Sequence, residues 1–195
     1  MKVGLLYSGG LESTILLSYY QMENIEVELL YLKVGFLWED AELLNIKKNL
    51  DESLVLHIVD LGKQFNTKQL GYVDKVKKNI IPNRNLLMLS IASTYFYNIG
   101  IINIAIGMQG GIEYPDTDMN YLNTLEKLIA KGLQEPKFKI QMPFYGLTKK
   151  EILSRFGSKI DLDTVFSCTN PINNKMCMKC YKCKKLNNLK SKRKK

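Results

Sequence analysis

The stretch Ser8-Gly9-Gly10-Leu11-Glu12-Ser13-Thr14 lies between a continuous apolar run at residues 3–7 and a segment of helical periodicity at residues 15–22. A strand that ends in a glycine turn and then enters a helix directs several backbone N–H groups and the positive end of the helix dipole toward one point. This arrangement predicts a phosphate-binding loop, although a glycine turn with a serine N-cap is a common structural alternative. The longer loop that ends in Gly-Lys-Ser/Thr does not occur here, which disfavours the kinase and GTPase classes.

Apolar runs typical of buried strands alternate with segments of helical periodicity. Strands are predicted at residues 3–7, 26–32, 54–60, 103–108 and 139–142, and helices at residues 13–22, 39–50, 66–79, 86–97, 119–131 and 149–156. This alternation predicts an α/β fold with a doubly wound, mostly parallel sheet and helices on both faces. Ligands of such sheets lie beyond the carboxyl ends of the strands, where the strand order reverses. We therefore expect the loops at residues 8–13, 33–38 and 109–117 to share one cleft.

The length and composition are sufficient for one sizeable core. The chain has 195 residues, of which 46% are hydrophobic. We expect an α/β domain at residues 1–165, a small module at residues 166–189, and a basic, disordered tail at residues 190–195. No apolar run reaches the roughly 20 residues that a membrane helix needs, and the chain begins directly with a strand, so we expect a cytoplasmic protein without a membrane partner.

The positive charge is concentrated at one end of the chain. The formal net charge is +9, but residues 175–195 hold ten basic and no acidic residues, and the rest carry a net charge of −1. The body of the protein is therefore a poor nucleic-acid surface. Only the tail has a charge that suits nucleic acid, and a solvated end is the simpler interpretation.

All four cysteines lie in one window with the spacing Cys168-x8-Cys177-x2-Cys180-x2-Cys183. Two-residue gaps let neighbouring thiolates converge on one tetrahedral ion, and nearby lysines favour the thiolate form. The pattern predicts a structural Zn²⁺ site that holds the C-terminal segment and takes no part in chemistry. Disulfides and a redox pair fit four clustered thiols of an intracellular chain less well. An iron–sulfur cluster uses the same ligands and is left open by the spacing.

Several segments, in order along the chain, resemble the motifs of one protein family. The loop at residues 8–14 is similar to the Ser-Gly-Gly-x-Asp-Ser loop of the N-type ATP pyrophosphatases (PP-loop superfamily), with Glu12 in place of aspartate. Four further segments resemble the QueC branch of that superfamily: Pro82-Asn83-Arg84-Asn85-Leu86, Gly107-Met108-Gln109 with Tyr114-Pro115-Asp116, Leu147-Thr148-Lys149-Lys150-Glu151, and the terminal cysteines. The resemblance spans residues 3 to about 186. It implies an adenine nucleotide alpha hydrolase-like (Rossmann-like) fold and favours zinc over an iron–sulfur cluster.

The resemblance also implies an activity. The QueC family is a family of ATP-dependent C–N ligases that convert 7-carboxy-7-deazaguanine and ammonia into the nitrile preQ0, the precursor of queuosine and archaeosine. ATP adenylates the carboxylate, ammonia forms the amide, and a second adenylation removes water from the amide. The implied cofactors are ATP, Mg²⁺ and Zn²⁺. Free ammonia is the expected nitrogen source because no glutaminase segment is visible, and a homodimer is the expected assembly.

The resemblance assigns roles to individual residues. The expected catalytic residues are Arg84, Lys149 and Glu12. Arg84 and Lys149 are expected to neutralise phosphate charge, and Glu12 to neutralise the helix end or to help hold Mg²⁺. The residues expected to bind ATP are Tyr7, Ser8, Gly9, Gly10, Leu11, Ser13, Thr14, Tyr31, Leu32, Lys33 and Gly107. The residues expected to bind the acceptor are Arg84, Asn85, Gln109, Tyr114 and Asp116. Asp116 is expected to accept hydrogen bonds from a guanine-like edge, with a turn or helix cap as its structural alternative.

The chain departs from the family pattern at Glu12 and after Asp116, where Thr117 and Asp118 replace the family's Cys-Arg. Loss of this arginine would weaken binding of a carboxylate substrate, so a second hypothesis stays open. In it, a QueC-like paralogue uses the same ATP chemistry on another acceptor. An example is the attachment of a deazaguanine to a macromolecule by a protein of a defence operon. A tRNA-modifying pyrophosphatase would need an RNA-binding domain or a separate catalytic cysteine, and neither is visible. The alternative from another class is a zinc-bearing RNA-binding module with a basic tail.

Overall fold

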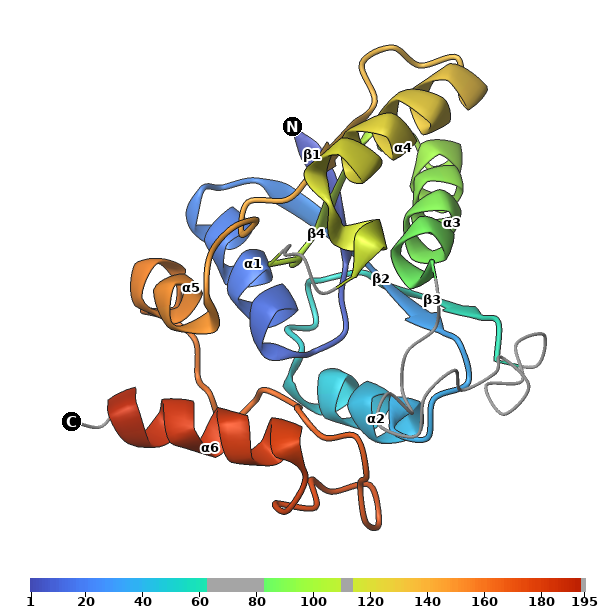
Figure 1. Ribbon diagram of the computed structural model, residues 1–195. Helices are drawn as coiled ribbons and strands as arrows, with labels where there is room; N and C mark the ends of the chain where they lie inside the picture. Colours follow the sequence, from blue (N-terminus) through green and yellow to red (C-terminus); the bar gives the residue numbers. More distant parts are fainter. Residues whose placement is uncertain (63–82, 110–113, 194–195) are drawn as a thin grey trace.

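The centre of the protein is a parallel sheet of five strands in the order β3-β2-β1-β4-β5. The computed structural model, shown in Figure 1, describes residues 1–62, 83–109 and 114–193. The strands are β1 (Lys2–Leu6), β2 (Glu26–Lys33), β3 (Leu56–Asp60), β4 (Asn103–Ile106) and β5 (Lys139–Gln141). From β1 the chain proceeds outward to β3 and then crosses back, so that β4 pairs with the free side of β1. The strand order therefore reverses between β1 and β4.

Helices cover both faces of the sheet, as the alternation of apolar runs predicts. The helices are α1 (Leu11–Met22), α2 (Glu39–Asn49), α3 (Arg84–Asn98), α4 (Met119–Gly132), α5 (Lys149–Phe156) and α6 (Tyr181–Arg193), with a short 3-10 helix at Pro115–Thr117. Helices α3 and α4 pack on one face, and α1, α2, α5 and α6 contribute to the core on the other (Figure 1). The doubly wound α/β prediction is confirmed. The helix predicted at residues 66–79 lies outside the described residues.

The central strands are apolar on both sides because both sides are covered. Side chains alternate across a strand. In β2, Leu29 and Tyr31 enter the core under α1, whereas Leu30 and Leu32 enter the core under α3. A strand buried on both faces reads as a continuous apolar run, which is why residues 26–32 are recognisable from the sequence alone.

The C-terminal segment is part of the fold and not an appendage. Leu186 of α6 is 3% exposed and lies in the same core as α1. The expectation of a disordered tail from residue 190 is wrong for residues 190–193, which continue α6. Lys190 pairs with Asp163 at 2.7 Å, and the Arg193 guanidinium donates to the Ile160 and Ser158 carbonyl oxygens at 2.9 and 2.8 Å. Residues 194–195 lie outside the described residues. Across the described ranges, no helix has the length and apolar character to cross a membrane.

Candidate functional site

A cavity of about 470 Å³ opens beyond the carboxyl ends of β1, β2 and β4, where the strand order reverses. This is the position at which doubly wound sheets bind ligands, and the volume suits a small molecule. Of the residues assigned from the sequence, the cavity wall includes Tyr7, Ser8, Glu12, Ser13, Tyr31, Leu32, Arg84, Asn85, Gly107, Gln109 and Tyr114. The loops after three different strands therefore line one cavity.

The loop after β1 is shaped by two glycines and by contacts between its own polar groups. Gly9 has a φ of +66°, and a Cβ there would lie 2.7 Å from Ile46 Cγ1. The Ser13 hydroxyl donates to the Gly10 carbonyl at 3.2 Å and accepts from the Ser8 N–H at 3.3 Å. Gly10 is the N-cap of α1 and provides no side-chain cap, so the N–H groups of the first turn are open to a ligand. These features suit an anion at the start of α1.

Gly107 brings the end of β4 against the first turn of α1. A Cβ at this position would lie 3.0 Å from the backbone carbon of Glu12 and 3.1 Å from the backbone nitrogen of Ser13. These contacts are with backbone atoms, which cannot rotate away. A side chain at position 107 would therefore push against the first turn of α1.

The acid inside the loop has a partner on another helix. The Glu12 carboxylate forms an ion pair with Lys149, the first residue of α5. Helix α5 begins with a capping box, in which the Thr148 hydroxyl accepts from the Glu151 N–H and the Glu151 carboxylate accepts from the Thr148 N–H at 2.9 Å. Lys149 is thus held at a fixed helix start, and its charge is balanced by the acid that departs from the family pattern.

Four of the assigned residues have other surroundings. Asp116 is 8% exposed, and its carboxylate accepts from the backbone N–H of Asn85 at 3.0 Å, which caps the start of α3. Thr14 lines a second cavity, of about 300 Å³, on the other side of α1. Lys33 pairs with Asp40 at 2.9 Å, and Leu11 is a core residue. The structure does not bring these four side chains, or that of Lys149, into the main cavity wall.

The cavity wall also holds two acids of α2 that the sequence did not single out. The Glu39 carboxylate accepts from the N–H groups of Val34 and Gly35 at 2.8 and 2.9 Å, which fixes the loop after β2. The Glu42 carboxylate accepts from the Tyr31 hydroxyl at 2.7 Å. Burial raises the pKa of Glu42 to about 7, although the Tyr31 hydroxyl and the nearby Lys182 lower it. Acids in the first turn of a helix are ordinary, so the sequence carried no sign of this role.

A lysine from the cysteine-rich segment completes the wall. The Lys182 ammonium lies 5.4 Å from the centre of the Trp38 ring, which stacks on Phe36 at 4.3 Å. The Lys182 side chain is exposed to solvent, yet many protein atoms surround its ammonium group. This burial lowers the pKa of Lys182, and the Glu42 carboxylate acts in the opposite direction. Nothing in the spacing of residue 182 indicates a place in the cavity, because its direction depends on how the cysteines fold.

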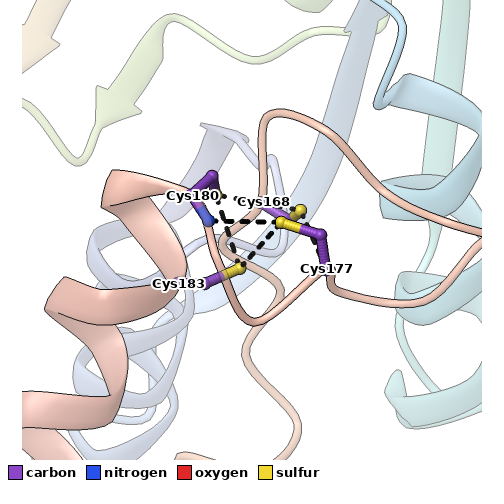
Figure 2. Close-up of side chains that lie close together, drawn as sticks. All are labelled: Cys168, Cys177, Cys180 and Cys183. Atoms are coloured by element: carbon purple, nitrogen blue, oxygen red, sulfur yellow. Dashed lines mark hydrogen bonds between the residues drawn. The ribbon is translucent and has the colours of Figure 1, made fainter.

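The four cysteine sulfurs point toward one another, as Figure 2 shows. All four are free thiols, and their sulfurs lie within 4.8 Å of one another. The separations are 3.4 Å for Cys180–Cys183 and 4.0 Å for both Cys177–Cys183 and Cys168–Cys180. Sulfurs at the corners of a tetrahedron around Zn²⁺ are about 3.8 Å apart, given Zn–S bonds of about 2.3 Å. The set therefore fits one tetrahedral ion.

The backbone around the cluster favours thiolates. The N–H groups of Asn170 and Cys177 donate to the Cys168 sulfur at 3.4 Å, and the Cys180 N–H donates to the Cys177 sulfur at 3.3 Å. The N–H groups of Lys179 and Cys180 lower the pKa of Cys177, whereas burial raises the pKa of Cys183. Hydrogen bonds that stabilise thiolates are what a cationic metal site requires.

Comparisons with known proteins agree with this geometry. Residues 2–190 match the family described as "Queuosine biosynthesis protein QueC". The 7-cyano-7-deazaguanine synthase 1 of Desulfitobacterium hafniense is 31% identical over 93% of this chain and 88% of its own length. The 7-cyano-7-deazaguanine synthase of Leptospira interrogans is 30% identical over 93% of this chain and 83% of its own length.

Two solved structures share the fold at low sequence identity. A predicted subunit of tRNA methyltransferase from Methanocaldococcus jannaschii has a TM-score of 0.54 and 14% identity, covering 80% of this chain and 76% of that one. A 4-thiouridine synthetase in complex with RNA and bound ATP has a TM-score of 0.53 and 18% identity, covering 97% of this chain and 50% of that one. The fold rests on these structures, and the family rests on the match across nearly the whole sequence. The chain belongs to the QueC family of queuosine biosynthesis proteins.

Proposed function

We propose that this protein is a 7-cyano-7-deazaguanine synthase that uses ATP to convert 7-carboxy-7-deazaguanine and ammonia into preQ0. The observation that carries the proposal is the match to 7-cyano-7-deazaguanine synthases over 93% of the chain. The cavity supports it, because the loop after β1, Arg84 at the start of α3 and Gly107 after β4 line the same space.

The proposed reaction needs no nucleophilic side chain. An oxygen of the substrate carboxylate attacks the α-phosphorus of ATP and releases pyrophosphate. Ammonia then attacks the acyl carbon, loses a proton and displaces AMP, which gives the amide. The amide oxygen attacks the α-phosphorus of a second ATP, pyrophosphate leaves, and loss of AMP and of both amide protons forms the nitrile. The protein has to position the reactants and neutralise phosphate charge.

The residues of the cavity suit these two tasks. The N–H groups in the first turn of α1, where no side chain caps the helix, would hold the pyrophosphate part of ATP. The Arg84 guanidinium can bind two phosphate oxygens at once. Mg²⁺ would arrive with the nucleotide and neutralise further charge. The four cysteines would hold Zn²⁺ as a closed structural site.

A direct assay tests the proposal. The protein is incubated with 7-carboxy-7-deazaguanine, ATP, Mg²⁺ and ammonium, and the formation of AMP, pyrophosphate and preQ0 is followed by mass spectrometry. We expect R84K to reduce the rate roughly tenfold to a hundredfold. The matched control is R155K, since Arg155 lies on the outside of α5 with its side chain 58% exposed. Nucleotide binding without any nitrile would contradict the proposed substrate.

One observation favours the alternative of a different acceptor. Asp118, which stands where the family has arginine, is the N-cap of α4 and accepts from the N–H groups of Asn120 and Tyr121 at 2.9 and 3.1 Å. This position therefore offers an acceptor's carboxylate no positive charge. If the assay yields pyrophosphate only with a different deazaguanine or with a macromolecular acceptor, the protein is a paralogue with the same ATP chemistry.

A further inference from the structure

Arg84 and Lys182 are two cationic side chains of the cavity wall that form no ion pair with another described residue. Within residues 1–62, 83–109 and 114–193, no carboxylate lies within ion-pairing distance of Arg84 or Lys182, although both line the cavity. Lys149, by contrast, is paired with Glu12. Lys182 interacts electrostatically first with Glu42 and then with Arg84, Lys149 and Glu12, so one of its two acidic neighbours is already paired and the other has a raised pKa. An ammonium and a guanidinium that form no ion pair within the described ranges, in one concave site, favour an anionic ligand.

The position of Lys182 depends on the cysteine cluster. Lys182 lies two residues after Cys180 and directly before Cys183, and the sulfurs of these two cysteines lie 3.4 Å apart. Cys183 packs with Cys168, Phe166 and Trp38 in one small core, and Trp38 is the ring beneath the Lys182 ammonium. The backbone next to Lys182 therefore has little freedom once the sulfurs converge on one ion.

The same small core contacts the phosphate-binding loop. The N–H of Phe166 donates to the carbonyl of Gly9 at 3.0 Å. The small core that contains the cysteines thus contacts this loop through Phe166 and contributes Trp38 to the cavity wall. A lysine fixed in this way meets its ligand with less loss of conformational entropy than a lysine on a free surface.

From these contacts we infer that Lys182 binds phosphate oxygens of the nucleotide, and that the four-cysteine cluster fixes this lysine in the cavity when it holds its metal. The inference rests on the proposed use of ATP and adds a binding residue to it. The cluster then has two roles, since it holds the C-terminal segment against the core and also positions a charge in the nucleotide site.

The first test compares the affinities of two nucleotide probes. The dissociation constants of a non-hydrolysable α,β-methylene ATP with Mg²⁺ and of adenosine are measured for the wild type, K182Q, K182R and K184Q. Lys184 is exposed, lies outside the cavity wall and is rotated about 200° around α6 from Lys182, so it is the matched control. We expect K182Q to weaken binding of the ATP analogue about tenfold with adenosine binding unchanged. K182R should retain most of the affinity, and K184Q all of it.

The outcomes separate the inference from the proposed function. Equal affinity of wild type and K182Q for the ATP analogue would overturn the inference. Loss of zinc from K182Q would also overturn it, as would a loss of adenosine affinity in K182Q as large as its loss of analogue affinity. Failure of the wild type to bind the analogue would instead overturn the proposed use of ATP. If K182Q weakens only binding of 7-carboxy-7-deazaguanine, the lysine binds the acceptor's carboxylate and the phosphate assignment is wrong.

The second test removes the metal. Zinc is stripped with a chelator, and analogue and adenosine affinities are measured beside the far-UV circular dichroism spectrum. We expect removal of zinc from the wild type to weaken analogue binding about as much as the K182Q substitution does. Removal of zinc from K182Q should weaken its analogue binding little further. Unchanged analogue affinity in the stripped wild type would show that the lysine is positioned without the metal.

Discussion

Glu42 lies in the cavity wall as a buried carboxyl group whose pKa is raised to about 7. An ordinary glutamate has a pKa near 4.5. Between these values the folded protein keeps a proton that the unfolded chain has lost. The free energy of unfolding therefore falls as the pH rises through this window.

The substitution E42Q removes this titration while it retains an oxygen that can accept from the Tyr31 hydroxyl. We expect E42Q to be more stable than the wild type by about 1–3 kcal/mol at pH 8 and nearly equal to it at pH 4.5. Urea unfolding at several pH values measures the difference. E52Q, at an exposed position, is the control. If the difference in unfolding free energy between wild type and E42Q does not change with pH, the raised pKa of Glu42 is contradicted.

Gly107 gives a second prediction at the level of one residue. An added methyl group would meet the backbone of Glu12 at 3.0 Å, so G107A has to displace the first turn of α1. We expect about tenfold weaker ATP binding and a loss of about 1–2 kcal/mol in stability. The matched control is G132A at the end of α4, where nothing lies within 4 Å of the added carbon. G132A should leave ATP binding unchanged, and equal affinities for G107A and G132A would refute the close-packing argument.

At the level of secondary structure, two helices begin with aspartate caps that differ in their surroundings. Asp116 caps α3 from a neighbouring segment, and Asp118 caps α4 directly. We expect D116A and D118A each to lower stability by about 0.5–2 kcal/mol. Only D116A should also weaken ATP binding, because Arg84 is the first residue of α3. Thermal unfolding and ATP titration measure the two effects.

The same pair of variants tests the role expected for Asp116 from the sequence. If D116A retains full stability but no longer binds 7-carboxy-7-deazaguanine, its carboxylate recognises the base. A capping role requires the opposite result, with lower stability and base binding reduced no more than ATP binding. D118A provides the reference for the loss of a cap alone.

At the level of the whole molecule, the C-terminal helix connects distant parts of the chain. Lys190 and Arg193 contact the segment at residues 158–163, and Leu186 lies in the main core. Truncation after Leu189 should lower the free energy of unfolding by about 1 kcal/mol. Truncation after Arg193 retains these contacts and is the control. Thermal unfolding compares the two.

The two truncations also test the nucleic-acid alternative. Removal of residues 190–195 should leave synthase activity intact, since none of the described residues 190–193 lines the cavity. RNA affinity that depends on the same residues, together with an absence of ATP turnover in the full chain, would support the binding-module hypothesis instead.

The sequence predicts the features that depend on neighbouring residues. Residues 3–7 and 26–32 are continuous apolar runs because their strands are covered on both faces, and this pattern needs no knowledge of the partners. The two-residue gaps between Cys177, Cys180 and Cys183 likewise allow the sulfurs to converge. The prediction of disorder from residue 190 is wrong for residues 190–193, because the contacts that hold α6 in place involve residues far away in sequence. Examples are the apolar neighbours of Leu186 and the carbonyl partners of Arg193.

The sequence by itself determined the parallel α/β sheet, the loop after its first strand and the cluster of four cysteines. Each follows from local periodicity or spacing, and the family resemblance follows from the order of short motifs. Only the tertiary structure decided which charges meet: Asp116 caps a helix, Glu12 pairs with Lys149, and Glu42 and Lys182 enter the cavity. The physical reason is that an electrostatic contact depends on distance in space, and segments more than a hundred residues apart come together only when the sheet and the cysteine cluster have formed.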